Sequence, residues 1–79
     1  MKLLVRLGCH LCEDAAQLLL HLGVSFERVD VDREIDLQKE YGQLVPVLYD
    51  QEAERELLYP FDAEAVLDFI SDERFLKRK

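Results

Sequence analysis

The sequence predicts an α/β fold in which a four-stranded mixed sheet has helices on both faces, with the element order β-α-β-α-β-β-α. In the first half of the chain, short apolar runs alternate with amphipathic segments, a pattern that indicates a parallel strand pair with a right-handed crossover. In the second half, two apolar runs flank a polar stretch, which indicates an antiparallel hairpin. No expected strand has a consistently polar side, so both faces of the sheet should be covered. At 79 residues, the chain should form one domain over residues 1–79.

The first half of the chain predicts a strand, a helix and a second strand. Residues 2–7 are an apolar run bounded by Gly8 and predict a buried strand. Residues 11–22 predict a helix that ends at Gly23, because apolar side chains recur at helical spacing and acidic side chains come first. Residues 24–31 alternate between apolar and polar side chains, with one slip, and predict the second strand.

The second half begins with a weaker helix and continues with the hairpin. Asp32 is a suitable N-cap for a helix that extends to about Tyr41 and ends at Gly42. Apolar runs at residues 45–49 and 55–59 predict the two hairpin strands. The polar residues between them lack an Asn-Gly or Asp-Gly pair, so the connecting loop should be longer than two residues.

The last element is a helix that begins after Asp62, its expected N-cap. Phe61 and Val66 stand at the N′ and N4 positions, where a hydrophobic staple forms. The apolar residues that follow predict the buried face of this helix, which consists of Val66, Leu67, Phe69 and Ile70.

Charge and hydropathy narrow the functional classes. Seventeen acidic against ten basic residues give a formal net charge of −7, which argues against nucleic acid or an anionic membrane surface as the partner. No segment approaches the roughly 20 apolar residues of a membrane span. Arg6 and Gly8 interrupt the apolar start of the chain before it reaches the length of a signal peptide. We therefore expect a cytoplasmic protein. We also expect it to be a monomer.

The most informative feature is the motif Cys9-His10-Leu11-Cys12, which contains both cysteines of the chain. It lies at a strand-to-helix junction, where backbone N–H groups and the helix dipole stabilise a thiolate. Residues i and i+3 share one helix face, so the two sulfurs can form a disulfide with little backbone movement. Since Cys9 comes first and should be the exposed sulfur, we expect Cys9 to attack a disulfide and Cys12 to resolve it. In the cytoplasm, a dithiol that cycles is more typical than a structural disulfide.

Two other uses of these cysteines fit the sequence less well. A structural zinc site needs four ligands, and His21 lies roughly 13 Å from Cys12 along the helix axis. His10 stands between the cysteines and should face elsewhere, so no metal site is expected. The remaining alternative is a pair of buried thiols without chemical function.

Together these residues resemble the glutaredoxin branch of the thioredoxin superfamily, in particular the very short glutaredoxin-like proteins of bacteria. The similarity extends over almost the whole chain. It rests on four features, which are Arg6 three residues before Cys9, the C-x-x-C pair, Gly42-Gln43 leading into Val45-Pro46, and Asp62 at the start of the last helix. The resemblance implies a thioredoxin-like fold of the glutaredoxin type, and a cis Val45-Pro46 peptide beside the active-site disulfide. It also implies substrate-binding roles for Arg6, Val45, Pro46 and Asp62.

The chain departs from the family pattern at two places. His10 and Leu11 stand between the cysteines, where glutaredoxins usually have Pro and Tyr. The segment Leu58-Tyr59-Pro60-Phe61 replaces a Gly-Gly pair before the last helix. In the family, those glycines let the γ-glutamyl end of glutathione approach the backbone closely. Glutathione binding is therefore a weaker expectation than dithiol chemistry.

The sequence thus predicts a thiol–disulfide oxidoreductase that reduces protein or low-molecular-weight disulfides through Cys9 and Cys12. It should hold no tightly bound cofactor, and glutathione is a candidate reductant. One alternative is that two copies bridge an iron–sulfur cluster through Cys9 and glutathione. Another is a non-enzymatic binding module that keeps the fold without the substrate site. The expected partner is a disulfide-containing protein or glutathione, and not nucleic acid or a membrane.

Overall fold

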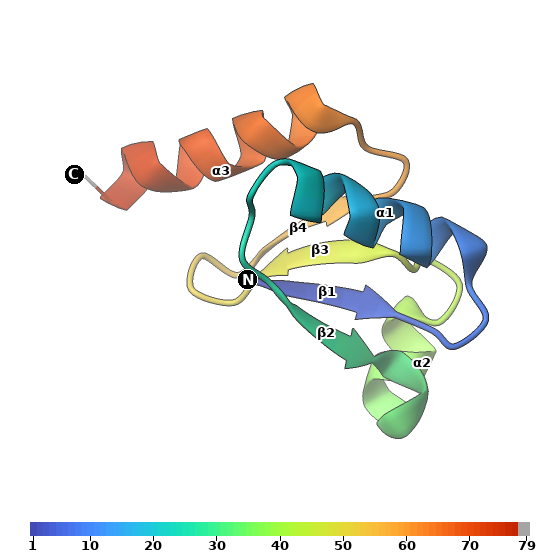
Figure 1. Cartoon of the computed structure of the whole chain (residues 1–79). Coiled ribbons are helices and arrows are strands. Elements are labelled where there is room, and N and C mark those ends of the chain that lie inside the picture. The colour runs from blue at the N-terminus through green and yellow to red at the C-terminus, as the bar shows by residue number, and fades with distance from the viewer. Residues whose placement is uncertain (78–79) are drawn as a thin grey trace.

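A computed structural model of the protein describes the backbone of residues 1–77 and the side chains of residues 1–71 (Figure 1). Its elements in chain order are β1 (Lys2–Val5), α1 (His10–His21), β2 (Glu27–Asp30), a 3₁₀ helix η1 (Val31–Arg33), α2 (Ile35–Tyr41), β3 (Val47–Asp50), β4 (Arg55–Leu58) and α3 (Ala63–Lys77). The predicted order is confirmed, and η1 is an addition to it. Within the described residues, no helix is both long and apolar enough to cross a membrane.

The four strands form one mixed sheet in the order β2-β1-β3-β4. The central strand β1 runs parallel to β2 and antiparallel to β3, and β4 completes the hairpin with β3. Helices α1 and α3 cover one face of the sheet, and α2 covers the other (Figure 1). This arrangement confirms the mixed sheet with helices on both faces.

The core has two parts because successive side chains of a strand point to opposite faces. Leu3 of β1 belongs to the larger cluster, between the sheet and helices α1 and α3. The buried members of that cluster are Leu3, Ala15, Ala16, Leu19, Leu48, Phe61, Val66 and Phe69. Leu4 belongs to the smaller cluster, with Val31 and Val47, against which Leu37 and Tyr41 of α2 pack. Helix α2 contributes no fully buried residue, as its thin apolar content suggests.

The start of α2 corrects one prediction. Asp32 was expected to be the N-cap, but the carboxylate that caps is that of Asp30, which accepts a hydrogen bond from the Asp32 N–H at 2.9 Å and begins η1. Helix α2 itself begins at Ile35 without a side-chain cap. The reason is that β2 ends one residue before the buried Val31, and the chain turns through η1 before α2 begins. Asp32 is instead paired with Arg6.

Several predicted bounds are also wrong by a few residues. The strand expected over residues 2–7 ends at Val5, and Leu7 is 88% exposed, because the chain turns away from the sheet at a Gly8 with φ +76°. Only residues 27–30 of the second expected strand pair with β1. The loop between β3 and β4 is longer than two residues, as predicted. At the start of that loop, the buried carboxylate of Asp50, the last residue of β3, accepts the Glu52 N–H at 3.0 Å.

The buried face of α3 is narrower than predicted. Val66 and Phe69 are buried and Ile70 packs partly against the same cluster, but Leu67 is 49% exposed. Positions i, i+3 and i+4 share a helix face, whereas i+1 lies about 100° around the helix. Burying Val66 therefore turns Leu67 toward solvent. The predicted staple is confirmed, since Phe61 and Val66 lie in one cluster.

The N-cap of α3 gives a testable prediction. Asp62 Oδ1 accepts the Ala65 N–H at 2.9 Å, as expected for a capping aspartate. Replacing Asp62 with alanine should lower the free energy of unfolding in urea by about 1 kcal/mol. Asp62→Asn keeps an acceptor oxygen and should retain most of the stability. An alanine variant as stable as the wild-type protein would contradict the assignment of this cap.

Candidate active site

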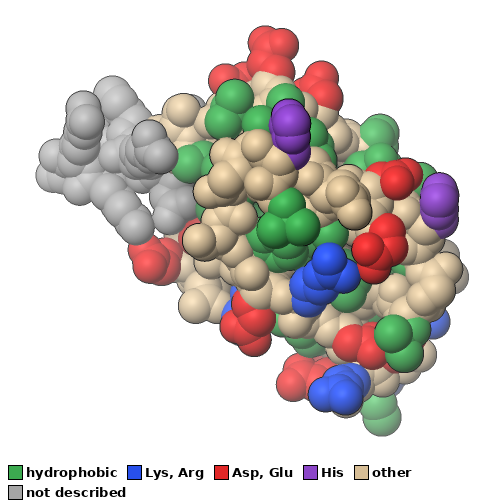
Figure 2. All heavy atoms as spheres, viewed as in Figure 1, with side chains coloured by type: hydrophobic (Ala, Val, Ile, Leu, Met, Phe, Trp, Pro, Cys, Tyr) green, Lys and Arg blue, Asp and Glu red, His purple; other side chains and the backbone are tan. Residues whose placement is uncertain are grey.

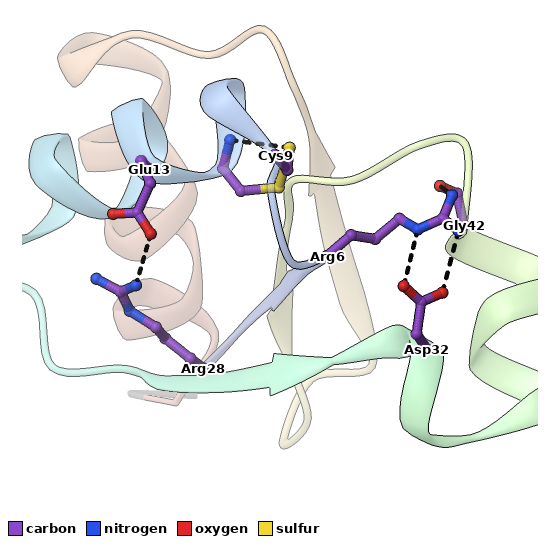
Figure 3. The surroundings of a disulfide bond; sticks show 7 residues. Arg6, Cys9, Glu13, Arg28, Asp32 and Gly42 are labelled. Carbon is purple, nitrogen blue, oxygen red and sulfur yellow. Dashed lines mark hydrogen bonds and ion pairs between the residues drawn. A yellow bond between two sulfur atoms is a disulfide. The ribbon is translucent and has the colours of Figure 1, made fainter.

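The two cysteines are joined in a disulfide at the start of α1 (Figure 3). Their Cα atoms lie 5.2 Å apart, within the usual range for a disulfide, so the predicted i, i+3 geometry is confirmed. Cys9 is the N-cap of α1, and its Sγ accepts a hydrogen bond from the Cys12 N–H at 3.1 Å. The sulfur of Cys9 thus occupies the place where a capping oxygen normally lies.

The two sulfurs differ in their access to solvent. Cys9 is partly exposed, whereas Cys12 is only 3% exposed and belongs to the buried side of α1. An external sulfur atom therefore reaches Cys9 first. The Cys12 N–H and the start of α1 both point toward Cys9 Sγ, a position where negative charge on sulfur is stabilised.

A short turn after β1 places Cys9 at the end of the sheet where the parallel strands β1 and β2 finish. The Cys9 N–H donates to the Arg6 carbonyl at 3.3 Å, and Gly8 between them has φ +76°. A Cβ at Gly8 would meet no atom within 4 Å, so the position requires glycine for its backbone conformation and not for space.

An open cleft of about 470 Å³ lies beside the disulfide. Its walls come from the end of β1, the turn after it, the start of α1 and the end of β2. The residues that line it are Val5, Arg6, Leu7, Gly8, Cys9, His10, Cys12, Glu13, Arg28 and Asp30. The cleft thus brings Arg6 together with both predicted catalytic cysteines, and its lining includes neither Val45, Pro46 nor Asp62.

Arg6 points away from the disulfide, toward α2 (Figure 3). Its Nε and Nη2 each lie 3.1 Å from a carboxylate oxygen of Asp32, and its Nη1 donates to the Gly42 carbonyl at 3.0 Å. One side chain therefore connects the end of β1, η1 and the loop that follows α2. It holds that loop against the turn that carries Cys9.

Val45 and Pro46 lie in this same loop, on its way into β3. Leu4 of β1 pairs with Val47, so the residues just before Val47 lie next to those just after Leu4. The Val45-Pro46 peptide is cis, as the resemblance implies, and Pro46 is fully buried. The N–H of Val45 donates to the Tyr41 carbonyl at 3.1 Å.

Tyr41 anchors the other end of the loop. A hydrogen bond from its hydroxyl to the Glu56 carboxylate, together with burial, raises the pKa of Tyr41 above its ordinary value. The raised pKa keeps the hydroxyl protonated in alkaline solution as well, so it remains a donor to Glu56 of β4. Its ring packs in the smaller core cluster, so this residue stabilises the loop rather than facing the cleft.

Asp62 lies apart from the cleft, and its carboxylate is used in the α3 cap. The segment before it packs inward. Phe61 is buried in the larger core cluster, and the ring of Tyr59 meets it edge to face with centroids 5.2 Å apart. The residues that stand in place of the family's Gly-Gly pair therefore contribute aromatic rings to the core.

Sequence reasoning missed two residues near the disulfide. Arg28 and Asp30 of β2 line the cleft, and Arg28 bonds to Glu13 in the first turn of α1 at 3.1 Å. The two strand residues could have been found from the sequence, because the expected parallel strands end at the same edge of the sheet and so bring their last residues close to the cysteine turn. Asp30 is paired in register with Val5, just before the cysteine turn.

Comparison with known proteins identifies the family. A sequence model of the Glutaredoxin-like domain (DUF836) matches residues 1–73. The chain belongs to this glutaredoxin-like family. The match confirms the family that the motif and element order indicated.

Solved structures of a related protein have the same fold. The X-ray structure of Northeast Structural Genomics target protein XcR50 from X. campestris is 36% identical, with a TM-score of 0.82, and the match covers 90% of this chain and 95% of XcR50. Its solution structure has a TM-score of 0.80 at 36% identity, covering 90% of this chain and 91% of XcR50. Among curated proteins, none matches the chain. The glutaredoxin-like chain thus has a thioredoxin-like fold, and its Cys9–Cys12 pair fits a thiol redox role.

Proposed function

We propose that this glutaredoxin-like protein is a thiol–disulfide oxidoreductase that reduces disulfides of other molecules through Cys9 and Cys12. The observation that supports it best is the unequal exposure of two bonded sulfurs at a helix N-terminus. Cys9 is accessible and accepts the Cys12 N–H, while Cys12 is buried directly behind it. This is the arrangement that a nucleophile and a resolving thiol require.

The reaction proceeds in two exchange steps. The Cys9 thiolate attacks one sulfur of the target disulfide, a new sulfur–sulfur bond forms, and the other target sulfur leaves as a thiolate that takes up a proton. Cys12 then loses its proton and attacks Cys9 Sγ, which releases the second target thiolate to be protonated. Two electrons pass from the protein dithiol to the target, and the Cys9–Cys12 disulfide remains. A second dithiol, or two equivalents of a low-molecular-weight thiol, returns it to the reduced state.

The loop around Pro46 has a proposed binding role in this cycle. It is held beside the cysteine turn by the bond from Arg6 to the Gly42 carbonyl, and Val47 pairs with β1. Pro46 has no N–H and the Val45 N–H is bonded to the Tyr41 carbonyl, so an extended substrate segment would align along the Val45 carbonyl. In this proposal Arg6 positions the loop, and Asp62 caps the N-terminus of α3.

The ionisation of Cys9 provides the direct test. In a Cys12→Ser variant, the pH dependence of iodoacetamide alkylation should have its midpoint well below that of a cysteine-containing peptide measured alongside. The reason is that the helix N-terminus stabilises the thiolate. A midpoint equal to that of the peptide, or above it, would argue against a nucleophilic role.

The cluster-bridging alternative has its own readout. Protein purified anaerobically should be colourless and contain no stoichiometric iron. A coloured dimer with bound iron and one reactive Cys9 per chain would contradict the proposal.

A further inference from the structure

Both arginines that line the cleft are already paired with carboxylates of the same chain (Figure 3). The Nε and Nη2 edge of Arg6 faces both oxygens of Asp32 at 3.1 Å. On the opposite side of the disulfide, Arg28 Nη1 lies 3.1 Å from Glu13 Oε1. Among residues 1–71, the cleft therefore presents no arginine or lysine without an acidic partner.

Asp32 occupies the edge of the Arg6 guanidinium that an anionic substrate would need for binding. A guanidinium binds a carboxylate best through two parallel N–H groups, and Asp32 already occupies that edge. Nη1 is bonded to the Gly42 carbonyl. A substrate carboxylate at this place has to displace Asp32, and it also meets Asp30, which lines the cleft. On the face shown in Figure 2, basic side chains likewise lie next to acidic ones.

Two exposed leucines flank Cys9 in the chain. Leu7 lines the cleft and is almost fully exposed, and Leu11 lies between the two cysteines and is half exposed. Apolar side chains grouped around a reactive group indicate a contact surface for another apolar chain.

From these features we infer the substrate class. The ion pairs Arg6–Asp32 and Arg28–Glu13 make the cleft unreceptive to anionic disulfides such as glutathione disulfide. The exposed leucines favour an apolar protein segment with neutral or basic residues around its disulfide. This inference rests on the proposed oxidoreductase function and adds its specificity. Asp32 is then a specificity-determining residue, because it withholds Arg6 from substrate carboxylates.

The test uses pre-reduced protein and the second-order rate constant for oxidation of its dithiol. The substrates are a leucine-containing disulfide peptide with two lysines, the same peptide with two glutamates, glutathione disulfide, and 2-hydroxyethyl disulfide as a small neutral reference. The lysine peptide should react about tenfold or more faster than glutathione disulfide, and faster than the glutamate peptide. Equal or reversed rates would overturn the inference.

Variants separate the contribution of the ion pairs to specificity from that of the exposed leucines. Asp32→Asn frees Arg6 and should raise the rates with the glutamate peptide and glutathione disulfide about three- to tenfold relative to 2-hydroxyethyl disulfide. Glu13→Gln should act in the same direction through Arg28. Asp36→Asn, an equal charge change at an exposed position of α2, should leave these ratios unchanged. Leu7→Ser should lower the ratio of the lysine peptide to the reference. If Asp32→Asn and Asp36→Asn behave alike, the inference fails.

A failure of the function itself has a different signature. If the reduced protein reacts with none of the four disulfides, including 2-hydroxyethyl disulfide, then the oxidoreductase proposal is wrong and the specificity falls with it. If all four react at similar rates, the oxidoreductase stands and only the inferred specificity is overturned.

Discussion

Cys9→Ser should lower the rate of disulfide reduction by a factor on the order of 10³ or more. A serine hydroxyl is not ionised at neutral pH, and Cys12, the one thiol that remains, is buried behind the first turn of α1. The measurement is the second-order rate constant of the pre-reduced variant with 2-hydroxyethyl disulfide, compared with that of the wild-type protein.

Cys12→Ser is the matched control for this change. It keeps the exposed nucleophile and removes the group that resolves the mixed disulfide, so partners should remain attached to Cys9 and be identifiable by mass spectrometry. A Cys9→Ser protein that traps as much would reverse the assigned roles. Retention of near wild-type reduction by Cys9→Ser would end the proposed mechanism.

The second large effect concerns stability. Leu19→Ala should lower the free energy of unfolding by about 2–5 kcal/mol, because Leu19 has 0% exposure in the cluster between α1 and the sheet. For a chain of this size, that is a large part of a total of about 4–12 kcal/mol. Urea denaturation followed by circular dichroism measures the change.

The neighbouring residue supplies the control, since Leu20 is the same residue type one position along α1 and is 61% exposed. Leu20→Ala should change the free energy of unfolding by no more than about 0.5 kcal/mol. Similar losses for the two variants would mean that the packing of α1 differs from that described. A Leu19→Ala protein that retains its structure in dilute buffer should still undergo disulfide exchange, because the substitution does not alter Cys9.

These predictions rest on features of different origin. The element order, the cysteine pair at the start of a helix, the Asp62 cap and the Phe61–Val66 staple were all predictable from the amino-acid sequence. Each depends on residues within a few positions of one another, so spacing and side-chain chemistry define it locally. The same local reasoning failed at Leu67 and Asp32, where the packing of the whole chain determines which side of an element is buried.

The ion pairs that line the cleft could not be predicted from the sequence, because they form only in the folded chain. Arg6 meets Asp32 across 26 residues, and Arg28 meets Glu13 across 15. Neither pairing has a signature in the sequence, because charged residues are common and only the parallel alignment of β1 with β2 and the position of α1 above them bring these pairs together. The disulfide chemistry of Cys9 could thus be predicted from residues close to it in the sequence. The proposed class of disulfide could not, because that proposal depends on side chains that become neighbours only when the sheet forms.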